Sequence, residues 1–116
     1  MNVKVITSNN FRKEAKRLIK KYPSLKKELA ELETELLLNP KIGTPIGKDC
    51  YKIRLAIKSK EKGKRGGARV ITYLIVNLIT RNTERSSVYL LSVYDKSEFE
   101  TISDKDLKRL ISELNI

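Results

Sequence analysis

The sequence predicts an α+β domain, in which a mainly antiparallel sheet is covered on one face by helices. Three observations predict this class. Apolar residues recur at helical spacing in three segments, they alternate or run continuously at strand spacing in four others, and short turn-rich stretches separate the later strands. The expected order is β-α-α-β-β-β-α. Strands joined by short loops pair antiparallel, and 116 residues is the length of one domain, which we place at 1–116.

The first half of the chain predicts a strand and a helical hairpin. Residues 3–7 are mostly β-branched, as in a short opening strand. Residues 11–22 carry an apolar stripe at helical spacing, with basic residues on the other faces, and a leucine stripe follows over 25–36. Pro23 separates the two helices. We expect this N-terminal hairpin to cover one face of the sheet, and a turn-rich stretch over 43–47 to lead out of it.

The second half predicts three strands and a C-terminal helix. Residues 51–58 alternate almost perfectly, so that the apolar side chains share one face of the strand and the basic side chains share the other. The basic set is Lys52, Arg54 and Lys58. Residues 69–78 are apolar on both faces, which indicates a central strand, and residues 87–94 form the next one. A capping box over 103–106 starts a helix with a leucine and isoleucine stripe.

The charge balance favours a polyanionic partner. Lys and Arg number 25 against 14 Asp and Glu, which gives a formal net charge of +11 and a sequence pI near 9.8. Such a surface attracts nucleic acid, and we weigh this against the simpler reading of a solvated surface that aids solubility. The excess charge lies in residues 1–23 and 41–73, which make one basic face if they meet in the fold.

Several classes of protein are disfavoured. Cys50 is the only cysteine, so no disulfide can form within the chain. The sequence has no histidine and no paired cysteines, so we expect neither a metal site nor a cofactor. The N-terminus lacks the apolar region of a signal peptide, and the longest apolar stretch, 70–79, is too short to span a bilayer. We therefore expect a cytoplasmic protein with no membrane partner.

A basic strand face can support RNA cleavage without a metal. The reaction removes a proton from the 2′-hydroxyl, gathers negative charge on the phosphate and protonates the leaving 5′-oxygen. Without histidine, these tasks fall to Lys, Arg, Tyr, Asp or Glu. Cations placed close together disfavour each other's charged form, so a crowded lysine can act as a base, while arginine clamps phosphate. Lys52 and Arg54 point the same way and fit these roles, although a solvated basic face is the commoner explanation.

Four segments together resemble the RelE/ParE toxin superfamily, and most of all its HigB-like branch. They are CYKIRL at 50–55, KGKRGG at 62–67, GARVITY at 67–73 and LLSVYDKSE at 90–98. The resemblance covers nearly the whole chain in the order of its elements. It implies a toxin of a type II toxin–antitoxin system, an mRNA interferase that cleaves messenger RNA in the ribosomal A site and inhibits translation. The implied partners are the ribosome, the mRNA and a cognate antitoxin protein.

The resemblance also implies roles for individual residues. Lys52 would be the general base, Arg54 and Arg69 would hold the scissile phosphate, and Lys96 would stabilise the phosphate or the leaving group. Further RNA contacts are expected from Lys58, Lys62, Lys64 and Arg65. Related toxins stack a tyrosine on a base just beyond the last motif. Ile102 stands at that position here, so Tyr73 or Tyr94 would have to replace it.

Two alternatives stay open at this point. A ParE-like inhibitor of DNA gyrase shares the fold but tends to lack the four basic residues named above. A non-catalytic RNA-binding or ribosome-binding module would use the basic sheet face as a phosphate platform, with a steep salt dependence and no cleavage.

Overall fold

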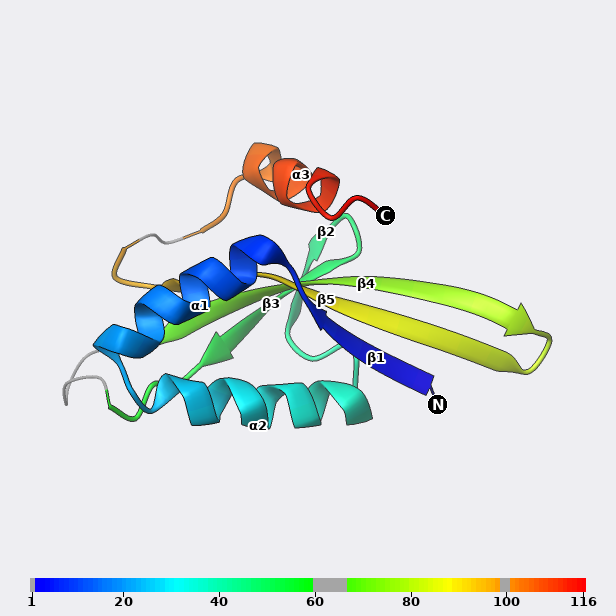
Figure 1. The fold of residues 1–116 in the computed structure, drawn as a ribbon. Coiled ribbons are helices and arrows are strands. Elements are labelled where there is room, and N and C mark those ends of the chain that lie inside the picture. Colours follow the sequence, from blue (N-terminus) through cyan, green and yellow to red (C-terminus); the bar gives the residue numbers. More distant parts are fainter. Residues whose placement is uncertain (1, 60–66, 99–100) are drawn as a thin grey trace.

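The computed structural model describes residues 2–59, 67–98 and 101–116, and confirms the α+β class. Within these residues, three helices pack on a five-stranded mixed sheet of order β1-β5-β4-β3-β2 (Figure 1). The elements in chain order are β1 (Asn2–Thr7), α1 (Asn9–Lys21), α2 (Leu25–Leu38), β2 (Thr44–Gly47), β3 (Cys50–Leu55), β4 (Ala68–Thr80), β5 (Thr83–Asp95) and α3 (Asp104–Ser112).

Strand β2 corrects the prediction of a turn-rich connection over 43–47. It pairs antiparallel with β3, with an irregularity between Pro45 and Gly47. Proline and glycine indicated a turn, but an edge strand tolerates both, because its outer side needs no N–H donor. Strands β4 and β5 are both longer than the predicted 69–78 and 87–94. The start of β5 was missed because its first residues are polar. The prediction of a central strand is confirmed, since β4 lies between β3 and β5.

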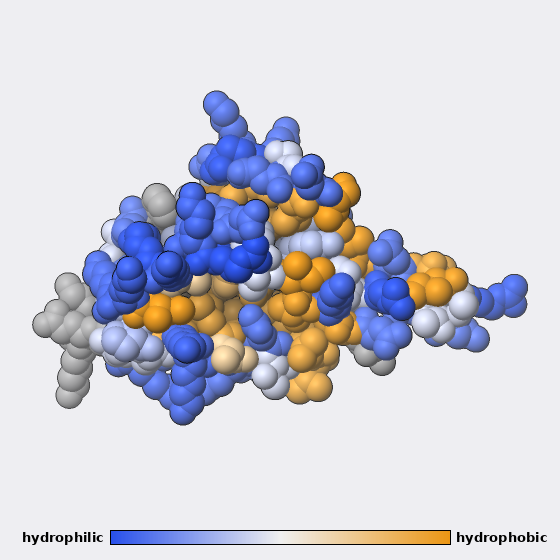
Figure 2. Space-filling view, viewed as in Figure 1, coloured by the Kyte–Doolittle hydropathy of each residue, from blue (hydrophilic) through white to orange (hydrophobic). Residues whose placement is uncertain are grey.

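The helical hairpin covers one face of the sheet, as predicted. Ser8 caps α1 by accepting a hydrogen bond from the Phe11 N–H at 3.0 Å. The apolar stripes of α1 and α2 then meet the sheet in one core cluster, which includes Leu18, Leu25, Leu36, Ile53, Val70, Val88 and Leu90. Each fully buried leucine contributes about 1.5–3 kcal/mol to folding. The outer surface of α1 is hydrophilic (Figure 2), with six basic side chains exposed to solvent: Arg12, Lys13, Lys16, Arg17, Lys20 and Lys21.

Helix α3 packs on the opposite face, so the expectation of helices on one face is incomplete. Ser103 caps α3 by accepting a hydrogen bond from the Asp106 N–H at 3.1 Å, as the capping-box pattern predicted. The helix covers a second core cluster formed by Cys50, Ile71, Leu91, Tyr94, Leu107 and Leu110. The face that carries Lys52 and Arg54 is therefore partly covered. None of the described helices is both long and apolar enough to cross a membrane.

Gly67 occupies a position that only glycine fits. Its φ is +47°, and a Cβ placed there would lie 2.3 Å from the carbonyl oxygen of Leu55. Its own carbonyl oxygen accepts a hydrogen bond from the Lys96 N–H at 3.1 Å. The residue therefore holds the end of β3, the start of β4 and the turn after β5 together.

Gly67→Ala should lower the free energy of unfolding by about 2 kcal/mol or more, because it adds a clash to left-handed strain. Chemical denaturation measures this loss. Gly47→Ala is the matched control, because Gly47 has φ +92° and no atom within 4 Å of a Cβ placed there. It should show the strain alone, about 1 kcal/mol. Equal losses in the two variants would mean that the approach of Gly67 to β3 does not matter.

Candidate functional site

Two basic side chains of β3, Lys52 and Arg54, begin a cationic group on the sheet face opposite the hairpin. The strand ends at Leu55, so Lys58, predicted on the same strand face, lies in the turn that follows. Ile53 is buried with the hairpin leucines, whereas Lys52 and Arg54 alternate with it onto the other face. Lys52 is half-buried and Arg54 is exposed. In the antiparallel register, Arg54 stands directly opposite Arg69 of β4, so that their Cβ atoms are about 5 Å apart. Three of the four predicted catalytic residues are thus neighbours.

Arg69 differs from Arg54 in its exposure. It is only 4% exposed, and its Nη1 donates a hydrogen bond to the Ala68 carbonyl oxygen at 3.1 Å. Tyr94 stands opposite it on β5. Burial raises the pKa of the Tyr94 hydroxyl, and the positive charge of Arg69 partly opposes that rise. Arg69 therefore supplies positive potential from below the surface, and Arg54 is the arginine of this pair that a phosphate can reach.

Lys96 joins the same end of the sheet from β5. Its N–H donates to the Gly67 carbonyl oxygen at 3.1 Å, beside the pair formed by Ala68 and Asp95. Lys96 is exposed. The structure thus brings the backbone of Lys96 to the start of β4, one residue before Arg69.

A buried carboxylate, Asp95, anchors the turn that follows β5. It is fully buried, and its Oδ2 accepts a hydrogen bond from the Tyr22 hydroxyl at 2.7 Å. Its Oδ1 accepts from the N–H and the hydroxyl of Ser97 at 2.9 and 2.8 Å. An ion pair of 3.0 Å between Arg17 and Glu98 ties α1 to the same turn. Sequence reasoning missed this support, although Asp followed two residues later by Ser is a turn signal.

The two tyrosines expected to contact a base lie in different surroundings. Tyr94 is 2% exposed and packs under α3 with Leu107 and Leu110. A base cannot stack on a ring covered in this way, which corrects the expectation for Tyr94. Tyr73 is half-buried, with its ring centroid 6.3 Å from that of Tyr89. It lies four residues along β4 from Arg69, about 13 Å away, but diagonally across from Lys52, whose direct partner on β4 is Ile71.

The remaining predicted RNA contacts follow β3 in the sequence. Lys58 is exposed, and its N–H donates to Glu28 Oε2 at 2.7 Å, which fixes the loop's first residues to α2. Three further predicted residues lie outside the described residues: Lys62, Lys64 and Arg65.

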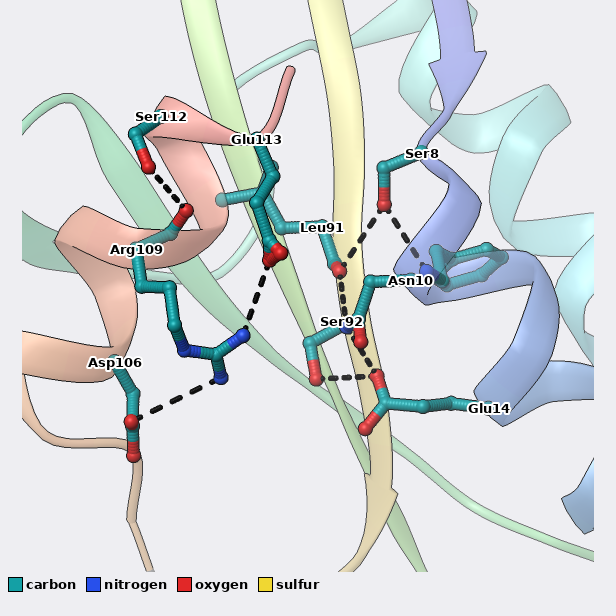
Figure 3. Close-up of polar contacts among 10 residues, drawn as sticks. Ser8, Asn10, Glu14, Leu91, Ser92, Asp106, Arg109, Ser112 and Glu113 are labelled. Carbon is teal, nitrogen blue, oxygen red and sulfur yellow. Dashed lines mark hydrogen bonds and ion pairs between the residues drawn. The ribbon is translucent and has the colours of Figure 1, made fainter.

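Helix α1 closes the open edge of β5 with polar side chains (Figure 3). Strand β1 pairs with β5 only as far as Leu90. Beyond that point, the Ser8 hydroxyl and the Asn10 amide donate to the Leu91 carbonyl oxygen at 3.2 and 3.0 Å. Glu14 accepts from the Val93 N–H at 3.2 Å. These side chains replace a neighbouring strand and leave β5 covered along this edge.

Glu14 also faces a pocket of about 110 Å³ between α1, β5 and α3. Its Oε1 accepts hydrogen bonds from the Ser92 hydroxyl and the Asn10 amide, both at 2.8 Å, besides the Val93 N–H. Burial raises the pKa of Glu14 above its ordinary value of 4.5, and these hydrogen bonds partly oppose the rise. Sequence reasoning did not single out Glu14, although it is the one acid among the seven basic residues of 1–23.

Glu14→Gln should be at least as stable as the natural protein at neutral pH, because the amide oxygen can accept the same hydrogen bonds without a buried charge. A raised folded-state pKa means that the stability linked to this group is present below the unfolded pKa and is lost as the pH rises through the folded pKa. Thermal melts from acid to neutral pH should therefore show a fall with pH that the glutamine variant lacks. Glu14→Ala should be destabilised by about 1–3 kcal/mol, because it orphans the Ser92 and Val93 donors. Equal losses in both variants would contradict the account.

No group of three or more Cys, Asp and Glu side chains in the described part of the chain is placed to hold a metal ion. No protein-family model matches the sequence.

Proposed function

We propose that this chain is the toxin of a type II toxin–antitoxin system, a metal-independent endoribonuclease that cleaves mRNA in the ribosomal A site. The observation that supports it most is the register of β3 and β4, which sets Arg54 opposite Arg69. Lys52 lies one step along the same face of β3, about 7 Å from Arg54, and Lys96 is hydrogen-bonded at the start of β4. A cationic group of this kind, in a chain of net charge +11, suits a polyanionic substrate.

The chemistry follows from the exposure of each side chain. Lys52 Nζ accepts the proton of the 2′-hydroxyl, and the resulting oxyanion attacks the adjacent phosphorus. Arg54 binds the phosphate oxygens, and Arg69 adds charge stabilisation from beneath. Lys96 donates a proton to the departing 5′-oxygen. The products are a 2′,3′-cyclic phosphate and a 5′-hydroxyl, so that atoms and protons balance without a water molecule or a metal ion.

This function carries expectations for partners and location. The enzyme works on mRNA held by the ribosome, so the protein acts in the cytoplasm and contacts ribosomal RNA with other basic residues, including Lys58. A cognate antitoxin protein neutralises it. The proposal assigns no base-stacking role to Tyr94, because that ring is buried.

The test is cleavage of a defined mRNA on programmed ribosomes, with the same RNA free in solution as the control. We expect cuts inside the A-site codon on ribosomes and little cleavage of the free RNA. Growth arrest without cuts would favour a gyrase inhibitor. Salt-sensitive RNA binding with neither cuts nor toxicity would favour a non-catalytic basic module, a reading to which the burial of Arg69 lends weight.

A further inference from the structure

The far end of the β4–β5 hairpin stands apart from the rest of the sheet. Strand β4 pairs with β3 only over Ala68 to Tyr73, with one more backbone bond, from the Leu74 N–H to the Asp49 carbonyl oxygen at 2.9 Å. Strand β5 pairs with β1 only from Arg85 onward. The intervening residues project as a two-stranded ribbon (Figure 1). Within the described part of the chain, the outer edge of β4 beyond residue 74 pairs with no other strand.

This edge is apolar and carries no charge. Residues 75–80 contain no charged residue and no proline, although natural edge strands are usually protected by one or the other. Val76, Leu78 and Ile79 are 46%, 68% and 49% exposed. Figure 2 shows this apolar patch between hydrophilic residues at the tip and at the base of the hairpin. An isolated two-stranded ribbon is marginally stable, so this part of the fold is suited to being covered by a partner.

The chemistry of the edge selects the occupant. An open strand edge offers alternating N–H and C=O groups, which an extended segment satisfies by adding as a further strand. Val76 and Leu78 lie two residues apart on one face, so every second residue of the segment should be apolar. Basic residues flank this part of the hairpin, with Arg81 at the tip and Arg85 opposite Asn77 on β5, against one acid, Glu84, opposite Leu78. Acidic residues should therefore flank the apolar ones.

We propose that the free edge of β4 binds an extended, acid-flanked segment of a partner protein by strand addition. A second copy of this chain suits the edge less well. Two copies would bring together chains that each carry a net charge of +11, and residues 75–87 hold two arginines against the single acid Glu84. The inferred docking does not depend on the ribonuclease activity proposed above.

The test uses a fluorescent peptide of alternating valine and threonine with glutamates at both ends, and its binding to the full chain is measured by anisotropy. Two control peptides replace the glutamates with lysines or place a proline at the centre. We expect the glutamate peptide to bind at least about tenfold more tightly than either control. Amide chemical-shift changes should fall on residues 75–80. No binding, or equal binding of the lysine peptide, would overturn the proposal.

A double variant, Val76→Glu with Leu78→Glu, keeps the experiment specific to the hairpin. Both side chains are exposed, so the variant should fold. It should bind the peptide at least about tenfold more weakly than the natural protein. Leu37→Glu with Leu38→Glu is the matched control, because these leucines are 48% and 81% exposed at the end of α2; this variant should bind as the natural protein does. Light scattering on the protein alone gives the last check, since a dimer that the hairpin variant dissociates would assign the edge to a second copy instead.

Discussion

Lys52→Ala should lower the rate of mRNA cleavage on ribosomes by at least about 100-fold, because the substitution removes the proposed general base. The side chain is half-buried on a strand face and belongs to neither apolar cluster, so the variant should stay folded. Single-turnover cleavage of a programmed ribosome complex measures the chemical step without the contribution of product release.

Two further variants identify what the lysine does. Lys41→Ala removes an exposed lysine outside the sheet and serves as the charge-matched control, with no expected change. Arg54→Lys keeps the charge but loses the planar, bidentate contact with phosphate, so it should retain more activity than Arg54→Ala. An unchanged rate in Lys52→Ala would remove this residue from the mechanism and leave the arginines as a binding platform.

Asp95→Ala should have the second largest effect, a loss of stability on the order of 3 kcal/mol, because it leaves the buried Tyr22 hydroxyl and the two donors of Ser97 without their acceptor. Tyr22 and Ser97 donate to this carboxylate from the two sides of the turn. Urea denaturation measures the loss. Tyr22→Phe removes the hydroxyl that donates to Asp95 and should cost about 1–2 kcal/mol.

The same substitutions test whether Asp95 positions Lys96. The cleavage rate and the affinity for the ribosome are measured well below the unfolding temperature. Asp95→Ala should lower the cleavage rate of the ribosome-bound protein more than it lowers the protein's affinity for the ribosome, because the turn that positions Lys96 is no longer fixed. Asp95→Asn should recover part of the rate, since its amide oxygen can still accept the Ser97 N–H. A variant that is destabilised yet cleaves at the natural rate would make Asp95 a purely structural residue.

The sequence determined which residues share a face, because alternation along one strand depends only on local pattern. Ile53 points to the hairpin core, and Lys52 and Arg54 point the other way, as predicted. The sequence could not determine that Arg54 meets Arg69, since the register depends on the length and shape of the loop between β3 and β4. The pairing of β4 with β5 was also not predictable, because β5 has an extra residue between the partners of Ile71 and Thr72, which shifts the register.

The burial of Arg69 and Tyr94 depends on long-range packing. Helix α3 carries a plain amphipathic stripe, and nothing in that stripe shows which face of the sheet it will cover. Its placement over Ile71 and Leu91 buries Tyr94 and leaves Arg54 at the surface. The sequence also could not predict that Glu14 hydrogen-bonds to the edge of β5, because this contact depends on where β1 stops pairing with β5.

The most direct test of the proposed chemistry replaces one 2′-hydroxyl of the mRNA, on the nucleotide 5′ to the mapped cut, with hydrogen. The altered mRNA is loaded on ribosomes, and both cleavage and binding of the protein are measured. We predict that cleavage disappears while binding is unchanged, and that the natural mRNA yields a 2′,3′-cyclic phosphate end. Continued cleavage of the 2′-deoxy mRNA would contradict the account, because the attacking oxygen could not then be the one that the basic face activates.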